Sequence, residues 1–135
     1  MNYWLFKSEP FKYSFDDLKK DGTTHWDGVR NHLAAKHMRT MKVGDKGFFY
    51  HSNEGLEIVG TVTVTKEYYP DPTDPKGKFI MVDVKYDSHL KRPVTLKEIK
   101  ADPALSEMAL VKLMRLSVGP VREEEWDHII EMSKN

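Results

Sequence analysis

The sequence contains no cysteine, and this absence removes several classes of chemistry at once. Disulfide bonds, thiolate catalysis and cysteine-based zinc sites are excluded, and the composition fits a reducing compartment. Hydrophobic runs are also short, since the longest, such as those at residues 3–6 and 108–111, have four residues each. Such runs are too short for a signal peptide or a membrane-spanning helix. We therefore expect no membrane association and a cytoplasmic location, nucleoid-associated or, in a eukaryotic host, nuclear.

The chain also lacks an excess of charge of either sign. Lys and Arg together number 21, as do Asp and Glu, so the formal net charge is zero. Proteins that bind duplex phosphates by bulk electrostatics usually carry a basic excess, so any nucleic-acid contact must come from a local patch. With 135 residues, of which 39% are hydrophobic and 31% charged, we expect one domain spanning residues 1–135 and a monomer.

Sequence motifs for metals, cofactors and hydrolysis are missing as well. His32 and His37 are five residues apart, about 140° around a helix, so they cannot share one ion from one face. His51 and Ser52 are adjacent, and neighbours on a strand point to opposite faces. There is no Gly-x-Ser-x-Gly elbow, no Gly-x-Gly-x-x-Gly and no phosphate-binding loop. We expect no metal site and no cofactor, and we interpret Ser52 as a hydrogen-bonding loop residue more readily than as a nucleophile.

Hydrophobic periodicity predicts a mixed α/β (α+β) fold. Alternating residues predict strands, which cover residues 3–6, 46–51, 58–65, 80–86 and 113–118. Helical spacing and capping residues predict helices, which cover about 14–20, 32–41, 102–109 and 122–132, with a further turn at 96–100. Prolines mark a rigid loop at 68–77 and an interruption at 91–93. Three successive antiparallel strands predict a closed or nearly closed barrel.

The segment of residues 26–31, Trp-Asp-Gly-Val-Arg-Asn, joins a loop to the predicted helix at 32–41. Gly28 can adopt a positive φ, and Asp27 or Asn31 can cap the helix. An indole held at such a junction either closes the core or forms one wall of a pocket for a planar ligand. The segment by itself leaves both alternatives open.

Several other loops carry planar, amide or hydroxyl groups. Aromatic faces stack on flat ligands, and amides and hydroxyls read hydrogen-bonding edges, so together they suit a nucleobase taken out of its stack. The residues with these groups are Trp26, Asn31, Ser52, Asn53, Tyr68, Tyr69 and Ser117. The structural alternatives are that Trp26 belongs to the core and that the Asn and Ser side chains only cap or turn the chain. The basic residues near Arg30 can likewise be an ordinary solvated surface.

Five segments, taken together and in order, resemble the EVE domain family. They are residues 3–10 (YWLFKSEP), 26–31 (WDGVRN), 48–53 (FFYHSN), 69–73 (YPDPT) and 115–118 (RLSV). The resemblance implies a PUA-like fold, an antiparallel β-barrel surrounded by short helices, similar to the YTH readers of methylated adenine. It also implies a reader, not an enzyme, that binds modified cytosine, chiefly 5-methylcytosine and its oxidised forms, in DNA.

The resemblance further implies a set of site residues. The base pocket would be lined by Ser8, Trp26, Asn31, Ser52, Asn53 and Ser117, with Tyr69, Asp71, Pro72 and Thr73 at its rim and Arg30 or Arg115 near the nucleic-acid backbone or the base edge. Three rival functions stay open. They are an RNA reader of a modified base, a pocket for a small nucleotide or for hydrolysis, and an interaction protein in which Trp26 is only a core residue.

Overall fold

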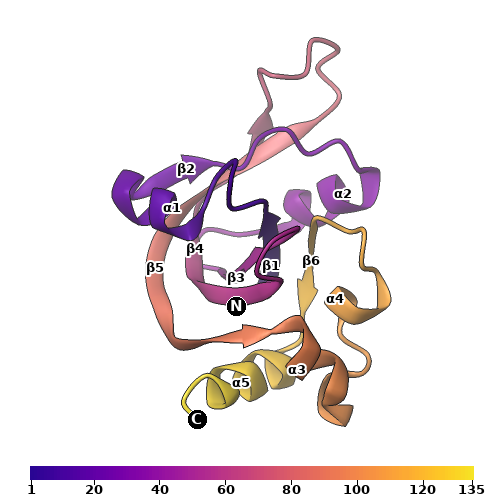
Figure 1. Cartoon of the computed structure of the whole chain (residues 1–135). Coiled ribbons are helices and arrows are strands. Elements are labelled where there is room, and N and C mark those ends of the chain that lie inside the picture. Colours follow the sequence, from indigo (N-terminus) through magenta and orange to yellow (C-terminus); the bar gives the residue numbers. More distant parts are fainter.

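Six strands form one strongly curved sheet in the computed structural model, which describes residues 1–135 (Figure 1). They are β1 (Tyr3–Ser8), β2 (Thr23–His25), β3 (Lys46–His51), β4 (Glu57–Pro70), β5 (Ile80–Thr95) and β6 (Val118–Val121). The order across the sheet is β2-β5-β4-β3-β1-β6, and only the β1–β3 pair is parallel. The sheet curls into a barrel, so strands distant in sequence enclose a common interior.

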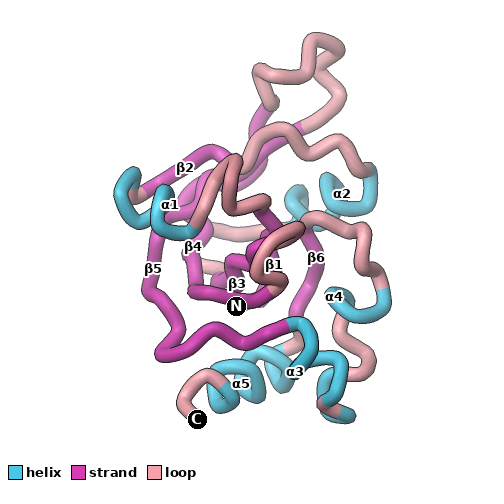
Figure 2. Tube along the Cα trace, viewed as in Figure 1, coloured by secondary structure: helices cyan, strands magenta, loops and turns pink.

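Short helices surround this barrel (Figure 2). They are α1 (Phe15–Asp21), α2 (His32–Thr40), α3 (Leu96–Ala101), α4 (Ala109–Lys112) and α5 (Glu123–Met132), with a 3-10 helix, η1, at Pro103–Leu105. Local sequence sets several of their ends, since Ser14 and Asp17 form the capping box that opens α1, and Asn31 caps α2. No helix has the length and hydrophobicity required to cross a membrane.

Hydrophobic residues form two cores, one on each face of the sheet. Adjacent residues of a strand point to opposite faces, and Phe48 and Phe49 of β3 accordingly belong to different clusters. Phe49 lies inside the barrel with Trp26, whereas Phe48 stacks on Trp126 of α5 at 3.9 Å between ring centroids. The central strands are therefore buried on both faces, which makes the barrel a rigid support for its loops.

Strands β4 and β5 are longer than the sequence predicted. β4 continues to Pro70, which pairs with Ile80, although a loop was expected from residue 68. β5 runs through residues 91–93, although Pro93 was expected to interrupt it. Pro93 is tolerated because it lies in an irregular stretch between the Gly60–His89 and Ile58–Val94 pairs, where strict ladder hydrogen bonding is not required.

The elements after residue 100 also differ from the prediction. The expected helix at 102–109 is divided into η1 and α4, and the expected strand at 113–118 begins only at Val118. Residues 113–117 form a loop that exposes Leu113 and Met114. The strand β6 instead uses Gly119 and Pro120, which an edge strand paired only with β1 can accommodate. Strand β2 was not predicted, because three residues carry too little periodicity.

Candidate functional site

A cavity of about 520 Å³ opens on one side of the barrel, a size typical of ligand pockets. Its walls come from the end of β1 and the following turn, from β2, from residues 26–31 and from the loop before β6. The lining residues are Lys7, Ser8, Glu9, Lys12, Tyr13, Thr24, His25, Trp26, Asp27, Gly28, Val29, Arg30, Asn31 and Ser117. Five predicted site residues are thus brought together, namely Ser8, Trp26, Arg30, Asn31 and Ser117.

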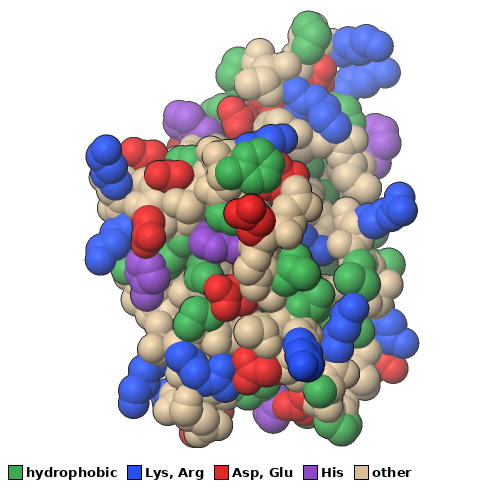
Figure 3. Space-filling model, viewed as in Figure 1, with side chains coloured by type: hydrophobic (Ala, Val, Ile, Leu, Met, Phe, Trp, Pro, Cys, Tyr) green, Lys and Arg blue, Asp and Glu red, His purple; other side chains and the backbone are tan.

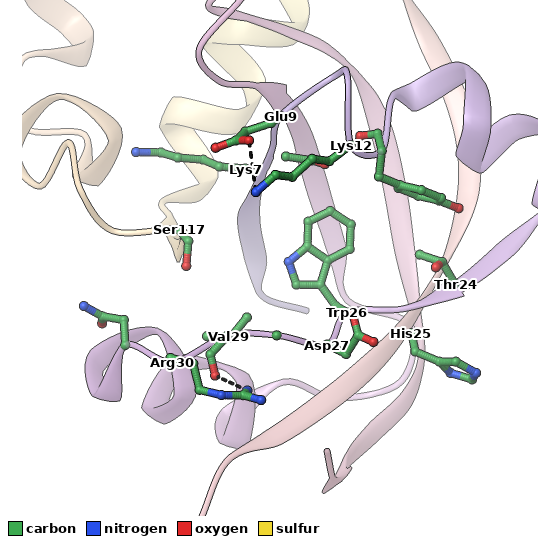
Figure 4. A pocket seen from close by; sticks show the side chains of 14 residues that line it. Lys7, Glu9, Lys12, Thr24, His25, Trp26, Asp27, Val29, Arg30 and Ser117 are labelled. Carbon is green, nitrogen blue, oxygen red and sulfur yellow. Dashed lines mark hydrogen bonds and ion pairs between the residues drawn. The ribbon is translucent and has the colours of Figure 1, made fainter. Parts of the chain in front are cut away.

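The Trp26 indole forms the inner wall of this pocket. It lies between the turn that carries Glu9 and Lys12 and the segment that carries Val29 (Figure 4). Behind it, the indole packs edge-to-face on Phe6 at 5.1 Å and on Phe49 at 5.6 Å between ring centroids. Its exposed fraction is 8%. The two alternatives left open by the sequence therefore coexist, because one side of Trp26 closes the core and the other meets the pocket.

The helix start next to Trp26 shapes the adjoining wall. Gly28 has a φ of 76°, a conformation in which other residues are strained. Asn31 then caps α2, since its Oδ1 accepts a hydrogen bond from the Ala34 backbone N–H at 2.9 Å. This bond fixes the side chain and leaves the amide NH₂ of Asn31 as a donor group on the pocket wall.

The Asp71 carboxylate holds the pocket segment of residues 26–31 in place by hydrogen bonds. It is buried and accepts hydrogen bonds from the Gly28 N–H at 2.8 Å, the Arg30 Nη1 at 3.2 Å, and the Thr73 N–H and Oγ1 at 2.8 and 2.6 Å. Burial would raise the pKa of this carboxyl, but the bonds from Thr73, Gly28 and Arg30 outweigh burial and hold the pKa at about 2. Asp71 is therefore ionised and occupied by protein donors.

Arg30 is held at the pocket edge by the loop between β4 and β5. Its Nη2 donates to the Thr73 Oγ1 at 2.9 Å, and its guanidinium lies over the Phe79 ring at 5.4 Å from the centroid. Figure 3 shows Lys and Arg side chains on and beside this projecting loop, with acidic side chains close to them. A cation therefore lies at the pocket edge although the net charge of the chain is zero.

Tyr69 contacts the pocket only through another side chain. Its hydroxyl donates to Asp83 and lies 2.9 Å from the His25 Nδ1. Burial, together with the bond to Asp83, raises the pKa of Tyr69 to about 12. Of the predicted rim residues Tyr69, Asp71, Pro72 and Thr73, none lines the cavity itself. The structure places them one layer behind His25, Gly28 and Arg30, and direct ligand contacts by them stay a prediction.

Three other predicted residues lie near the pocket but outside its lining. Ser52 donates its backbone N–H to the Ser8 carbonyl at 2.9 Å, and its side chain does not reach the cavity. Asn53 is exposed in the β3–β4 loop, where its φ of 67° is one that Asn tolerates. Arg115 is exposed two positions before Ser117. Their roles in binding stay predictions.

Several lining residues were not identified from the sequence. Lys7 is half-buried, donates from Nζ to the Met114 carbonyl at 2.7 Å, and has its pKa lowered by that burial. Lys12 forms an ion pair with Glu9 at 3.4 Å. Lys7 and Glu9 lie within the segment 3–10 that resembles the family, which was the available signal, whereas Thr24 and His25 belong to the unpredicted β2.

The lining set combines an aromatic wall, hydroxyl and amide groups, and cations at the edge. Such a set can stack on a flat ring, read its hydrogen-bonding edge and neutralise a nearby anion. The structure holds no group of three or more His, Asp or Glu side chains arranged to bind a metal ion. Non-covalent recognition of a planar, anionic ligand is the chemistry that these residues offer.

The chain is similar to proteins of known family and structure. The family model of the EVE domain matches residues 2–132. Mouse thymocyte nuclear protein 1 is 38% identical, over 98% of this chain and 74% of its own length. The solved structure of Rpa0253 from Rhodopseudomonas palustris is 52% identical with a TM-score of 0.94, covering 99% of this chain and 94% of its own.

A structure of human THYN1 protein in complex with DNA containing 5-methylcytosine is 36% identical with a TM-score of 0.94. It covers 100% of this chain and 99% of its own. These matches span nearly the whole barrel and all its helices, and they confirm the PUA-like fold expected from the sequence segments. The chain belongs to the EVE domain family.

Proposed function

We propose that this protein is a non-enzymatic reader that binds DNA through a modified cytosine, 5-methylcytosine or one of its oxidised forms, flipped into the pocket. The observation that carries the proposal is the Trp26 indole, which forms the inner wall of a cavity of about 520 Å³ between hydrogen-bonding groups and cations. The complex of the human THYN1 protein with DNA containing 5-methylcytosine supports it, since that relative shares the fold at a TM-score of 0.94.

The energetics suit an extruded base. Stacking on an aromatic side chain contributes about 1–3 kcal/mol per base, which is comparable to the cost of unstacking the base. Net affinity then depends on hydrogen bonds to the base edge and on phosphate contacts. Asn31 and Ser117 supply the first kind of group, and Lys7, Lys12 and Arg30 supply cations for the second.

Binding fits the pocket groups better than hydrolysis does. The Ser8 Oγ donates to the Tyr13 carbonyl at 2.6 Å, and His25 contacts Asp83 at 2.8 Å, so the two do not form a nucleophile and base pair. His51 is also occupied, because its Nε2 accepts the Phe15 backbone N–H at 3.1 Å. Ser52, the candidate nucleophile of the hydrolytic alternative, does not line the cavity, and turnover that is lost in Ser52→Ala would favour that alternative over binding.

An oligonucleotide with one 5-methylcytosine is expected to bind about fivefold more tightly than its unmodified twin. An apolar contact rewards a methyl group by about 1 kcal/mol. The measurement is a fluorescence-anisotropy titration against single-stranded and duplex DNA and RNA, each unmodified or carrying 5-methylcytosine, 5-hydroxymethylcytosine or N6-methyladenine. Equal affinity across the panel contradicts the proposal, and a preference for modified RNA favours the RNA-reader alternative.

Binding is also expected to depend only weakly on salt. Three cations line the pocket, Lys7, Lys12 and Arg30, and the net charge of the chain is zero. Each neutralised phosphate contributes about −0.9 to the slope of log affinity against log salt concentration, so we expect a slope near −3. Titrations between about 50 and 200 mM salt measure it. A slope steeper than about −5 would imply an extended phosphate-binding surface and refute this expectation.

A further inference from the structure

The turn after β1, residues 9–13, forms one wall of the pocket and is held in shape by its own hydrogen bonds. The backbone N–H groups of Lys12 and Tyr13 both donate to the Glu9 carbonyl, at 3.0 and 2.9 Å. The Ser8 Oγ donates to the Tyr13 carbonyl at 2.6 Å and closes the turn. Phe11 does not line the cavity itself, but it belongs to this turn and directly precedes the lining residue Lys12, so we infer that it lies beside the pocket rim.

Phe11 is an exposed aromatic residue that the fold does not use. Its exposed fraction is 66%, and it belongs to neither hydrophobic core. The two neighbouring aromatic residues behave differently, since Tyr13 packs against the barrel core and Phe15 is buried in it. Burying a Phe side chain stabilises a fold, and at Phe11 most of that gain is not realised within the chain.

We propose that Phe11 stacks on the nucleobase next to the one that occupies the pocket. This inference rests on the proposed function and names a second base-binding position beside the first. When one base leaves the stack, its neighbour loses a stacking partner and exposes a π-face at the pocket mouth. An aromatic side chain fixed at that mouth replaces the lost partner, whatever the identity of the neighbouring base.

The cation beside Phe11 fits the same arrangement. The Lys12 Nζ lies 6.0 Å from the Phe11 ring centroid and 3.4 Å from the Glu9 carboxylate. Its side chain is 71% exposed, so the ammonium can move from Glu9 to a phosphate at little cost. Phe11 and Lys12 would then contact the base and the phosphate of one neighbouring nucleotide, while Trp26 holds the modified base.

The first test compares Phe11→Ala with wild type and with Phe11→Trp. Because the side chain is exposed, the melting temperature of Phe11→Ala should match that of wild type. Affinity for the 5-methylcytosine oligonucleotide, in the strand form that wild type binds best, should fall about 5- to 100-fold. Phe11→Trp should retain it. Val43→Ala is the matched control, since Val43 is 60% exposed and does not line the pocket, and it should change neither the melting temperature nor the affinity.

The second test asks whether Phe11 acts on the neighbouring base. Affinity for the free nucleoside 5-methyldeoxycytidine should be the same for wild type and Phe11→Ala. Removing the base on one side of the modified cytosine, as an abasic site, should weaken wild type about as much as Phe11→Ala does. In Phe11→Ala the same abasic site should cause little additional loss, since the interaction is already absent.

The outcomes separate this inference from the proposed function. Three results would each overturn the role of Phe11 and leave the proposed function standing. Phe11→Ala could bind the oligonucleotide as tightly as wild type does, or it could lose equal affinity for nucleoside and oligonucleotide. The effects of the abasic site and of the substitution could also prove independent of one another. Failure of wild type to bind any modified oligonucleotide would overturn the proposed function and this inference with it.

Discussion

Replacing Trp26 with alanine is expected to lower the free energy of unfolding by about 3–5 kcal/mol. The indole is 8% exposed and contacts Phe6 and Phe49 inside the barrel, so its removal leaves a cavity in the core. The same change should also weaken base binding by about 1–3 kcal/mol, because the stacking wall is lost. A denaturant titration measures the first effect, and a binding curve corrected for the folded fraction measures the second.

Trp126→Ala is the matched control for this experiment. Trp126 is 9% exposed, stacks on Phe48 at 3.9 Å and on Tyr3 at 4.6 Å, and lies in the other core, away from the pocket. Its loss should destabilise the protein about as much as Trp26→Ala does while leaving the affinity of folded molecules unchanged. If folded Trp26→Ala binds the modified oligonucleotide as tightly as wild type, Trp26 is a core residue only.

Asp71 is expected to make stability sensitive to acid. The pKa of its carboxyl is about 2 in the folded protein against the ordinary Asp value of 3.8, which corresponds to about 2 kcal/mol of stability at neutral pH. The folded pKa is the lower one, so this contribution is present above pH 4 or so and is lost as the pH falls towards 2. Denaturant titrations between pH 7 and pH 2 should show the loss.

Asp71→Asn should remove the contribution of Asp71 to the pH dependence of stability, and it should also disturb the pocket wall. One carboxylate oxygen becomes an NH₂ group, so either Gly28 and Arg30 or Thr73 loses its acceptor. We expect a loss of about 2 kcal/mol or more at pH 7 and weaker oligonucleotide binding, because Gly28 and Arg30 both line the cavity. A variant that keeps the wild-type acid profile and full affinity would show that Asp71 supports neither.

Glu98→Gln is the control variant for Asp71→Asn, because it removes a similar carboxylate away from the pocket. The pKa of the Glu98 carboxyl is also about 2, held down chiefly by hydrogen bonds from Arg92 and the Thr95 backbone N–H. Glu98 lies on α3 and lines no part of the pocket. Its substitution should alter acid stability to a smaller degree, since its side chain is 35% exposed, and it should leave affinity unchanged.

Local sequence signals predicted the elements that local contacts build. The Ser14 capping box, the Asn31 cap and the Gly28 turn act over four residues or fewer, and the structure contains each of them. The helical stripe of Trp126 and Ile129 likewise faces the core. Helical spacing in residues 32–41 would place Leu33 on the buried face of α2, but Leu33 is 41% exposed, because the short residues Ala34 and Ala35 make the close contact with the barrel.

The family and the central pocket residues were thus accessible from the sequence by itself. Five sequence segments that follow one another in the same order as in the family identified the EVE domain. The indole of Trp26, close to Gly28, indicated where a planar ligand could bind. Periodicity also located the long central strands, because a strand buried on one or both faces must repeat its hydrophobic residues at a fixed interval.

Only the tertiary structure showed which distant residues contact one another and which of them line the pocket. Asp71 and Gly28 are hydrogen-bonded although 43 positions separate them, and Lys7 and Met114 although 107 positions separate them. Neither contact leaves a local pattern in the sequence. The short edge strands β2 and β6 exist because a longer neighbour pairs with them, not because of their own propensity. Barrel closure brings these distant segments together, and it is this closure that makes Trp26 both a core residue and a pocket wall.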